Sequence, residues 1–233
     1  LHEYNSAQCA LSGKASVNLT EITGQEGYTI HRLLGYNPHD GYTINKENPL
    51  TSDIVILDEL SMVDEGLFYK LIQSIKDGAK LIMLGDIGQL QSIGVGNIIN
   101  DLIESEVVTH INLTQIHRQA KKSAIALDSI EVWNGVQIID KDFYGSEIRG
   151  ELQDLELDIY KNSDDTADKI MEHFKKIYEE VTHIMDLQVI VPMKNRGEAC
   201  SSKLNNLIQS YIREIEGEPE DDICVKIGDD YML

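Results

Sequence analysis

The chain has 233 residues, of which 42% are hydrophobic and 6% aromatic, and its formal net charge at pH 7 is -20. This length suits one large domain, or one domain with part of a second, around a core of aliphatic side chains. The excess of acid argues against a protein that coats nucleic acid through bulk positive charge. The three cysteines have no disulfide or zinc spacing, and no apolar run is long enough to span a membrane. We therefore expect a cytoplasmic protein with no membrane partner.

Short aliphatic runs alternate with helical patterns along the first part of the chain. Strands are predicted at 7–11, 54–57, 81–84 and 107–113. Helices are predicted from about Lys14, at 29–34 with Thr29 as the N-cap, across 67–75, at 98–104 and at 123–133. The order strand, helix, strand between 54 and 84 is typical of a parallel sheet, so the predicted fold class is α/β with helices on both faces of the sheet.

The composition changes around Asn134-Gly135, where the periodicity weakens and acidic residues become more frequent. We predict a domain boundary there, which divides the chain into 1–135 and 136–233. In the second part, strands are predicted at 155–160 and 187–191, helices at 166–178 and 201–212, and an exposed acidic loop at 214–222.

Two adjacent carboxylates, Asp58 and Glu59, come directly after the aliphatic run 54–57. In open α/β sheets, ligands bind at the carboxyl ends of the strands. Because neighbouring side chains on an extended segment point in different directions, Asp58 could hold Mg²⁺ while Glu59 activates an attacking water. Taken alone, this motif fits a solvated strand end equally well.

The next predicted strand ends in Gly85-Asp86, so another carboxylate is expected at the same edge. Gly85 permits close approach of the backbone, and the amide of Gln89 can bond both a phosphate oxygen and a water. Two strands that end in acids and are separated by one helix favour a nucleotide site.

Arg118 follows the predicted strand 107–113. A guanidinium in this place can reach a terminal phosphate and stabilise the charge of the transition state. The alternative is an ion pair with a surface acid, which is common in so acidic a protein.

These motifs together resemble those of the RecD-like superfamily 1 DNA helicases, the exodeoxyribonuclease V alpha-subunit family. Residues 58–64, DELSMVD, are similar to the family's DEASMVD motif, and residues 85–97 are similar to its GDxxQLPSVGxGN motif. The LTEIFRQ, TIHRLLGYNP, TGRA, TPM and LNxxLQ segments of the family match residues 113–119, 29–38, 12–15, 191–193 and 204–209.

The resemblance implies a RecA-like P-loop NTPase domain, followed by part of a second RecA-like domain. It implies that ATP and Mg²⁺ bind at the acidic edge. The implied roles are Mg²⁺ ligand for Asp58, catalytic base for Glu59, γ-phosphate sensor for Gln89, arginine finger for Arg118, and nucleotide contacts for Gly85 and Asp86. The residues implied to lie near single-stranded DNA are Ser12, Lys14, Thr29 and His31. Lys194 and Arg196 could meet phosphate or DNA, although a solvated loop is the alternative for them.

Family members move 5′ to 3′ on single-stranded DNA in recombination and repair, so we expect an ATP-dependent helicase. Other subunits of a recombination nuclease complex are candidate partners. No GxxxxGKS/T motif occurs in the 233 residues, and in the family it lies just upstream of the matching segment. We therefore expect a fragment of a longer helicase that is inactive alone. One alternative is a non-catalytic interaction module with a degenerate motor fold. Another is a different P-loop ATPase, which the combined motifs disfavour.

Overall fold

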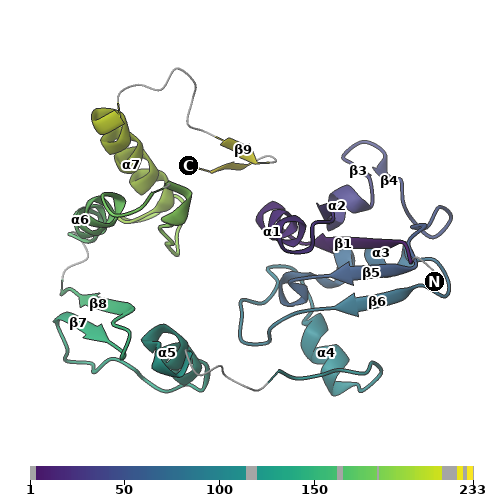
Figure 1. The fold of residues 1–233 in the computed structure, drawn as a ribbon, viewed down its shortest axis with the longest axis horizontal. Coiled ribbons are helices and arrows are strands. Elements are labelled where there is room, and N and C mark those ends of the chain that lie inside the picture. The colour runs from purple at the N-terminus through teal and green to yellow at the C-terminus, as the bar shows by residue number, and fades with distance from the viewer. Residues whose placement is uncertain are drawn as a thin grey trace. The chain divides into compact units, whose positions relative to one another are not determined.

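The computed structural model describes residues 4–113, 120–161, 165–182, 184–216, 225–227 and 230–232. Contacts divide the chain into two units, Leu1–Leu113 and Thr114–Leu233, which are drawn together in Figure 1. Within the described ranges, no helix has the length and apolar character needed to cross a membrane.

A four-stranded parallel sheet forms the centre of the first unit. Its strands are β2 (Gly27–Thr29), β1 (Ser6–Ala10), β5 (Ile54–Leu57) and β6 (Lys80–Met83), in that order across the sheet. Val55 of β5 lies opposite Ala7 of β1 on one side and opposite Leu81 of β6 on the other. Helix α3 (Glu65–Gln73) joins β5 to β6, so the predicted strand–helix–strand unit is confirmed.

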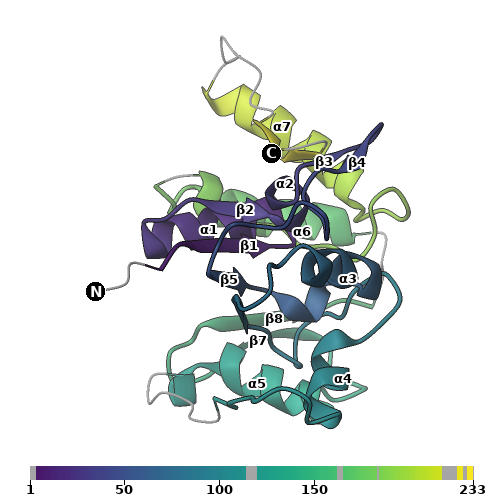
Figure 2. The same ribbon diagram turned by 90° about the vertical axis from the view of Figure 1, so that its right-hand side faces the viewer.

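Helices cover both faces of this sheet. Helix α1 (Gly13–Thr23) joins β1 to β2, and α3 joins β5 to β6. The two connections step across the sheet in opposite directions, and right-handed crossovers then place α1 and α3 on opposite faces. Figure 2 shows the same unit turned by 90°, with α1 alongside β1 and β2, which it contacts.

The core of the first unit consists of aliphatic side chains, as the composition predicts. Val55 and Leu57 of β5 and Leu71 of α3 are fully buried. Burying each such side chain contributes about 1.5–3 kcal/mol. Leu67 is also buried, while Ile72 on the same helix is 42% exposed, so only part of the predicted apolar face reaches the core.

Several shorter elements belong to the first unit as well. Helix α2 (Ile30–Leu33) begins after Thr29, whose Oγ1 accepts a 3.2 Å hydrogen bond from the N–H of Arg32, so the predicted N-cap is confirmed. Helix α4 (Ile98–Glu104) has the predicted bounds. The sequence did not predict the hairpin of β3 (Tyr36–Asn37) and β4 (Gly41–Tyr42) or the 3-10 turn η1 (Leu60–Met62).

The second unit begins earlier than the boundary that the composition predicts near residue 135. Helix α5 (Ala124–Trp133) follows the 3-10 turn η2 (Ala120–Lys122). It is joined by a hydrogen bond and an ion pair to the hairpin of β7 (Gly145–Arg149) and β8 (Leu155–Ile159). The N–H of Ala124 donates to Asp154, and Arg149 pairs with Asp128 at 3.0 Å. These contacts make α5 part of the second unit.

Helices α6 (Thr166–Tyr178) and α7 (Ser201–Glu216) pack together in the second unit, with η3 (Ile184–Asp186) between them in sequence. Their shared core contains Met171, Phe174, Ile208 and Ile212. The described strands of this unit, including β9 (Val225–Ile227) and β10 (Asp230–Met232), form only antiparallel pairs. The part of a second RecA-like domain therefore stays a prediction. The first residues of the predicted acidic loop 214–222 belong to α7, which continues to Glu216, and residues 217–222 lie outside the described residues.

Two predicted strands are wrong. Residues 107–113 form no strand, and Val107, Ile111 and Leu113 are 72%, 85% and 96% exposed. Residues 187–191 form no strand either, and Leu187 and Val189 pack instead against the α6–α7 core. An aliphatic run becomes a strand only where a neighbouring strand supplies hydrogen-bond partners, and no strand among the described residues pairs with either run.

Candidate functional site

The carboxyl ends of all four parallel strands lie at one edge of the sheet. Thr29 ends β2, Ser12 lies two residues after the end of β1, Asp58 follows β5, and Gly85-Asp86 lies just beyond β6. The prediction that the two acid-ended strands reach one edge is therefore confirmed. The connection after β1 leads to β2 and the connection after β5 leads to β6, in opposite directions across the sheet. Open α/β sheets bind ligands between two strands whose connections diverge in this way.

The chain turns sharply at Glu59, directly after the sheet. The N–H of Asp58 still donates to the carbonyl of Cys9 in β1, at 2.9 Å. Glu59 then adopts a left-handed backbone conformation, with φ 56° and ψ 41°, which costs a non-glycine residue about 1–3 kcal/mol. Asp58 Oδ1 accepts a 2.9 Å hydrogen bond from the N–H of Glu59, so the first carboxylate helps to hold the second residue in this turn.

The carboxylates at this edge repel one another electrostatically. Burial, and then the negative charges of Asp58 and Asp86, raise the pKa of Glu59 above its ordinary value. A carboxylate with a raised pKa is a better proton acceptor. Grouped carboxylate oxygens are the ligands that Mg²⁺ prefers, and a bound cation would offset the repulsion among them. The residues present therefore fit a magnesium ion held by Asp58.

The loop after β6 presents Gln89 to solvent. The carboxylate of Asp86 accepts a hydrogen bond from the N–H of Gly88 at 2.8 Å, and its carbonyl accepts one from the N–H of Gln89 at 3.2 Å. Both Asp86 and Gln89 are exposed, so the turn leaves the Gln89 amide available to a ligand.

The glycines of this loop lie against the protein itself. A Cβ at Gly85 would lie 2.8 Å from Ile99 Cδ1, and a Cβ at Gly94 would lie 2.6 Å from the Cβ of Asp64. A Cβ at Gly96, whose φ is +108°, would lie 3.0 Å from the Cβ of Glu65. The sequence anticipates close approach at Gly85 but misses that the approach is to other residues of the chain. The nucleotide contact of Gly85 stays a prediction.

Ser12 and Thr29 both act as helix N-caps at the same edge. Ser12 Oγ accepts from the N–H of Ala15 at 3.2 Å, and Lys14 lies in the first turn of that helix. A hydroxyl that accepts a capping bond keeps its own proton for donation, for example to a phosphate oxygen. Exposed His31 lies edge-on to Tyr36 and stacks on Tyr42 at 6.2 Å between ring centroids.

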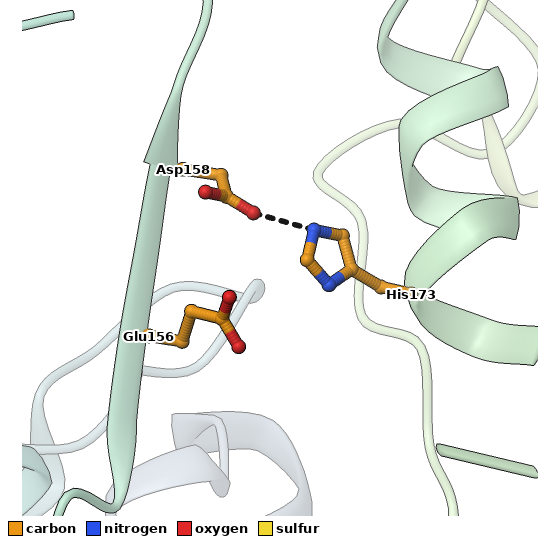
Figure 3. A group of neighbouring side chains, drawn as sticks. All are labelled: Glu156, Asp158 and His173. Carbon is orange, nitrogen blue, oxygen red and sulfur yellow. Dashed lines mark ion pairs between the residues drawn. The ribbon is translucent and has the colours of Figure 1, made fainter. Parts of the chain in front are cut away.

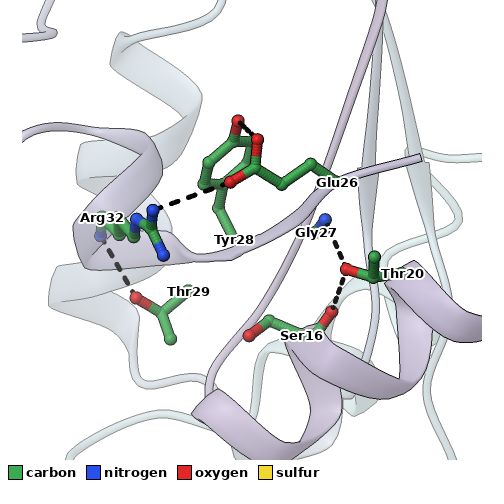
Figure 4. Close-up of polar contacts among 7 residues, drawn as sticks. All are labelled: Ser16, Thr20, Glu26, Gly27, Tyr28, Thr29 and Arg32. Carbon is green, nitrogen blue, oxygen red and sulfur yellow. Dashed lines mark hydrogen bonds and ion pairs between the residues drawn. The ribbon is translucent and has the colours of Figure 1, made fainter. Parts of the chain in front are cut away.

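Close packing of β2 on α1 fixes the position of Thr29 (Figure 4). The N–H of Gly27 donates to Thr20 Oγ1 at 2.9 Å, and a Cβ at position 27 would lie only 2.4 Å from the carbonyl oxygen of Ser16. On the other side, Arg32 pairs with Glu26 at 3.6 Å. Thr29 is therefore held between two anchored segments.

The other predicted site residues do not belong to the first unit. Arg118 lies in 114–119, outside the described residues. Lys194 and Arg196 are exposed in the second unit, where the carbonyl of Lys194 accepts from Ser202 and neighbouring Lys203 pairs with Glu198. The β3–β4 hairpin with its tyrosines was missed, although the Asp40-Gly41 pair is a turn signal that could have revealed it.

Residues 2–141 match the protein family described as "AAA domain". This match covers more than half of the chain, and the chain belongs to that family. Within it, the chain is a RecD-like superfamily 1 helicase region, and the parallel sheet of the first unit is the α/β sheet of a RecA-like domain.

The curated relatives include ATP-dependent DNA helicases and subunits of the RecBCD enzyme. The chain is 38% identical over 117 residues to the "ATP-dependent RecD2 DNA helicase" of Deinococcus radiodurans, covering 50% of this chain and 16% of that protein. It is 41% identical over 90 residues to the "RecBCD enzyme subunit RecD" of Haemophilus influenzae, covering 38% and 14%. It is 27% identical over 231 residues to the "ATP-dependent DNA helicase dda" of phage T4, covering 90% and 51%. The chain therefore spans only part of each relative.

Proposed function

We propose that this chain carries the hydrolytic side of the ATP site of a DNA helicase motor. The observation that carries the proposal is the common edge of the parallel sheet, where Asp58, Glu59 and Asp86 follow β5 and β6. Beside them, Ser12 and Thr29 follow β1 and β2. One edge thus offers carboxylate ligands for a metal ion that carries the phosphates, and hydroxyl donors for a nucleic-acid backbone.

In this proposal each residue of the acidic edge has one role in Mg²⁺-ATP hydrolysis. Asp58 holds the metal ion, and Glu59, whose pKa is raised by burial and by its acidic neighbours, accepts the proton of the attacking water. Gln89 contacts the γ-phosphate, and Gly85 and Asp86 contact the nucleotide. Arg118 supplies positive charge to the transition state.

Single-stranded DNA is the proposed track, contacted by Ser12, Lys14, Thr29 and His31, with Lys194 and Arg196 in the second unit. In a chain of net charge -20, these contacts must act locally, through hydroxyl and ammonium donors to a few phosphates. From the resemblance of the motifs to those of RecD-like helicases, we propose 5′ to 3′ movement in recombination and repair, with other subunits of a nuclease complex as partners.

The phosphate-gripping motif would come from another part of a longer protein. The 233 residues contain no GxxxxGKS/T, whose lysine and backbone amides cradle the phosphates of related ATPases. The matched segments span 16% and 14% of the two RecD relatives. Another segment of a longer protein would then bind the phosphates, and this chain would provide the metal ligand and the base.

A strand-displacement assay on the longer protein tests the proposal. A labelled oligonucleotide is annealed so that the duplex has a single-stranded tail at its 5′ end, at its 3′ end, or no tail. The proposal predicts Mg²⁺- and ATP-dependent displacement only from the 5′-tailed duplex. Displacement from only the 3′-tailed duplex would contradict the polarity, and nucleotide-independent binding without displacement would support a non-catalytic interaction module, which the missing motif also allows.

A further inference from the structure

A histidine and two carboxylates from separate elements converge in the second unit, far along the chain from the acidic edge (Figure 3). Glu156 and Asp158 are two residues apart on β8 and therefore lie on the same face of the strand. His173 comes from α6. One ligand atom of each residue lies within 4.8 Å of the others.

Asp158 is the most buried member of this group. Its side chain is only 13% exposed, and its Oδ2 lies 2.5 Å from the Nε2 of His173. Its second oxygen, Oδ1, is buried and has no hydrogen bond of normal geometry among the described residues. The β7–β8 hairpin and α6 thus leave a carboxylate oxygen buried and free for a further ligand.

The groups around Asp158 favour the carboxylate form of its side chain. The Ser146 hydroxyl first, and then the imidazole of His173 and the Tyr160 hydroxyl, lower the pKa of Asp158 despite its burial. The neighbouring Lys169 pairs with Glu172 at 2.6 Å, so its positive charge is already matched. An ionised carboxylate is the form that binds a metal ion.

We propose that Glu156, Asp158 and His173 form a binding site for a divalent transition-metal ion, with Zn²⁺ as the best fit. One imidazole nitrogen and two carboxylate oxygens form a ligand set that Zn²⁺ accepts, whereas Mg²⁺ and Ca²⁺ prefer oxygen ligands alone. Three protein ligands leave a coordination position for water. On binding, the ion takes the place of the proton between Nε2 of His173 and Oδ2 of Asp158. This site is independent of the proposed helicase function.

A metal ion here would link β8 to α6, two elements joined in the structure by the His173–Asp158 pair. Because the unfolded chain does not hold these ligands together, binding would stabilise the folded second unit. Glu156 is exposed, so the ion could enter from solvent without unfolding.

Calorimetric titration of the metal-free chain with Zn²⁺ tests this inference. We expect one saturable site, with affinity lowered about tenfold or more in Glu156→Gln and in His173→Gln. Glu172→Gln is the matched control, since it removes the same charge next to His173 from a residue outside the cluster. It should bind Zn²⁺ like the unaltered chain.

Substitution with Co²⁺ distinguishes this site from the cysteines. The proposed ligands predict visible bands of the bound ion without the near-ultraviolet charge-transfer band of a thiolate ligand. Because Glu156 is exposed, Glu156→Gln should keep the far-ultraviolet circular dichroism of the folded chain. The proposal is overturned by a thiolate band, by the lack of saturable Zn²⁺ binding, or by equal affinity in Glu156→Gln and Glu172→Gln.

Discussion

Gly94 lies so close to Asp64 that a Cβ at position 94 would be 2.6 Å from the Cβ of Asp64. Next to this contact, the N–H of Glu65 donates to the carbonyl of Val95 at 3.0 Å. At the other end of the loop, the N–H of Leu60 donates to the carbonyl of Leu84 at 2.9 Å. The loop that carries Asp86 and Gln89 is thus attached at both ends to the segment that follows Asp58 and Glu59.

Gly94→Ala should disturb this attachment. The added methyl group overlaps Asp64, and relieving such overpacking typically costs about 1–3 kcal/mol of stability. If Gln89 acts on the γ-phosphate, the shifted loop lowers kcat for ATP hydrolysis in the longer protein more than it lowers ATP affinity. Gly78→Ala is the control, because Gly78 has a positive φ of +83° but open space around it. Equal turnover in the two variants would mean that the attachment does not position Gln89.

The raised pKa of Glu59 predicts a pH dependence of stability. A group whose pKa is higher in the folded state stabilises the fold while it is protonated, and this contribution is lost as pH rises through the folded pKa. Burial and the charges of Asp58 and Asp86 therefore make ionised Glu59 unfavourable at neutral pH. Glu59→Gln should raise the free energy of unfolding in metal-free buffer at neutral pH.

Urea denaturation measures this difference, which should disappear below the ordinary glutamate pKa of 4.5, where Glu59 is protonated in both states. The exposed Glu21 on α1 provides the control, and Glu21→Gln should change little at either pH. A destabilised Glu59→Gln chain at neutral pH would show that the ionised carboxylate has a stabilising partner, contrary to this account.

Ser12→Asp separates helix capping from DNA contact. Aspartate is as good an N-cap as serine, so α1 and the melting temperature should be preserved. A carboxylate in place of the hydroxyl would repel a DNA phosphate, and affinity for single-stranded DNA should fall in the longer protein. Fluorescence anisotropy with a labelled oligonucleotide measures the change, and Ser12→Asn, which caps a helix equally well without the charge, is the control. Unchanged affinity would remove Ser12 from the DNA contact.

Much of the first unit could be predicted from local pattern. The aliphatic runs before Asp58 and Asp86 became β5 and β6, and Thr29 became an N-cap, because these signals depend on residues close in sequence. The runs 107–113 and 187–191 have the same local pattern, but a strand also needs a partner, which local pattern does not reveal. The packing of Gly94 on Asp64 and the approach of His173 to Asp158 join residues distant in sequence, so neither could be foreseen.

The 233-residue chain alone should bind ATP weakly, because its residues include no GxxxxGKS/T motif to hold the phosphates. Titration with a fluorescent ATP analogue measures this. Adding the segment that contains such a motif should restore tight binding. Micromolar affinity in the 233-residue chain would show that the acidic edge grips the nucleotide without that motif.

We propose Glu59 as the base of ATP hydrolysis at the acidic edge. Its most direct test compares ATP binding and ATP turnover in the longer protein with and without Glu59→Gln, since the amide keeps the shape of the side chain and loses only the proton acceptor. We expect nearly unchanged ATP affinity and a fall in kcat of about 10²–10⁴-fold. Turnover that survives the substitution would contradict this proposal.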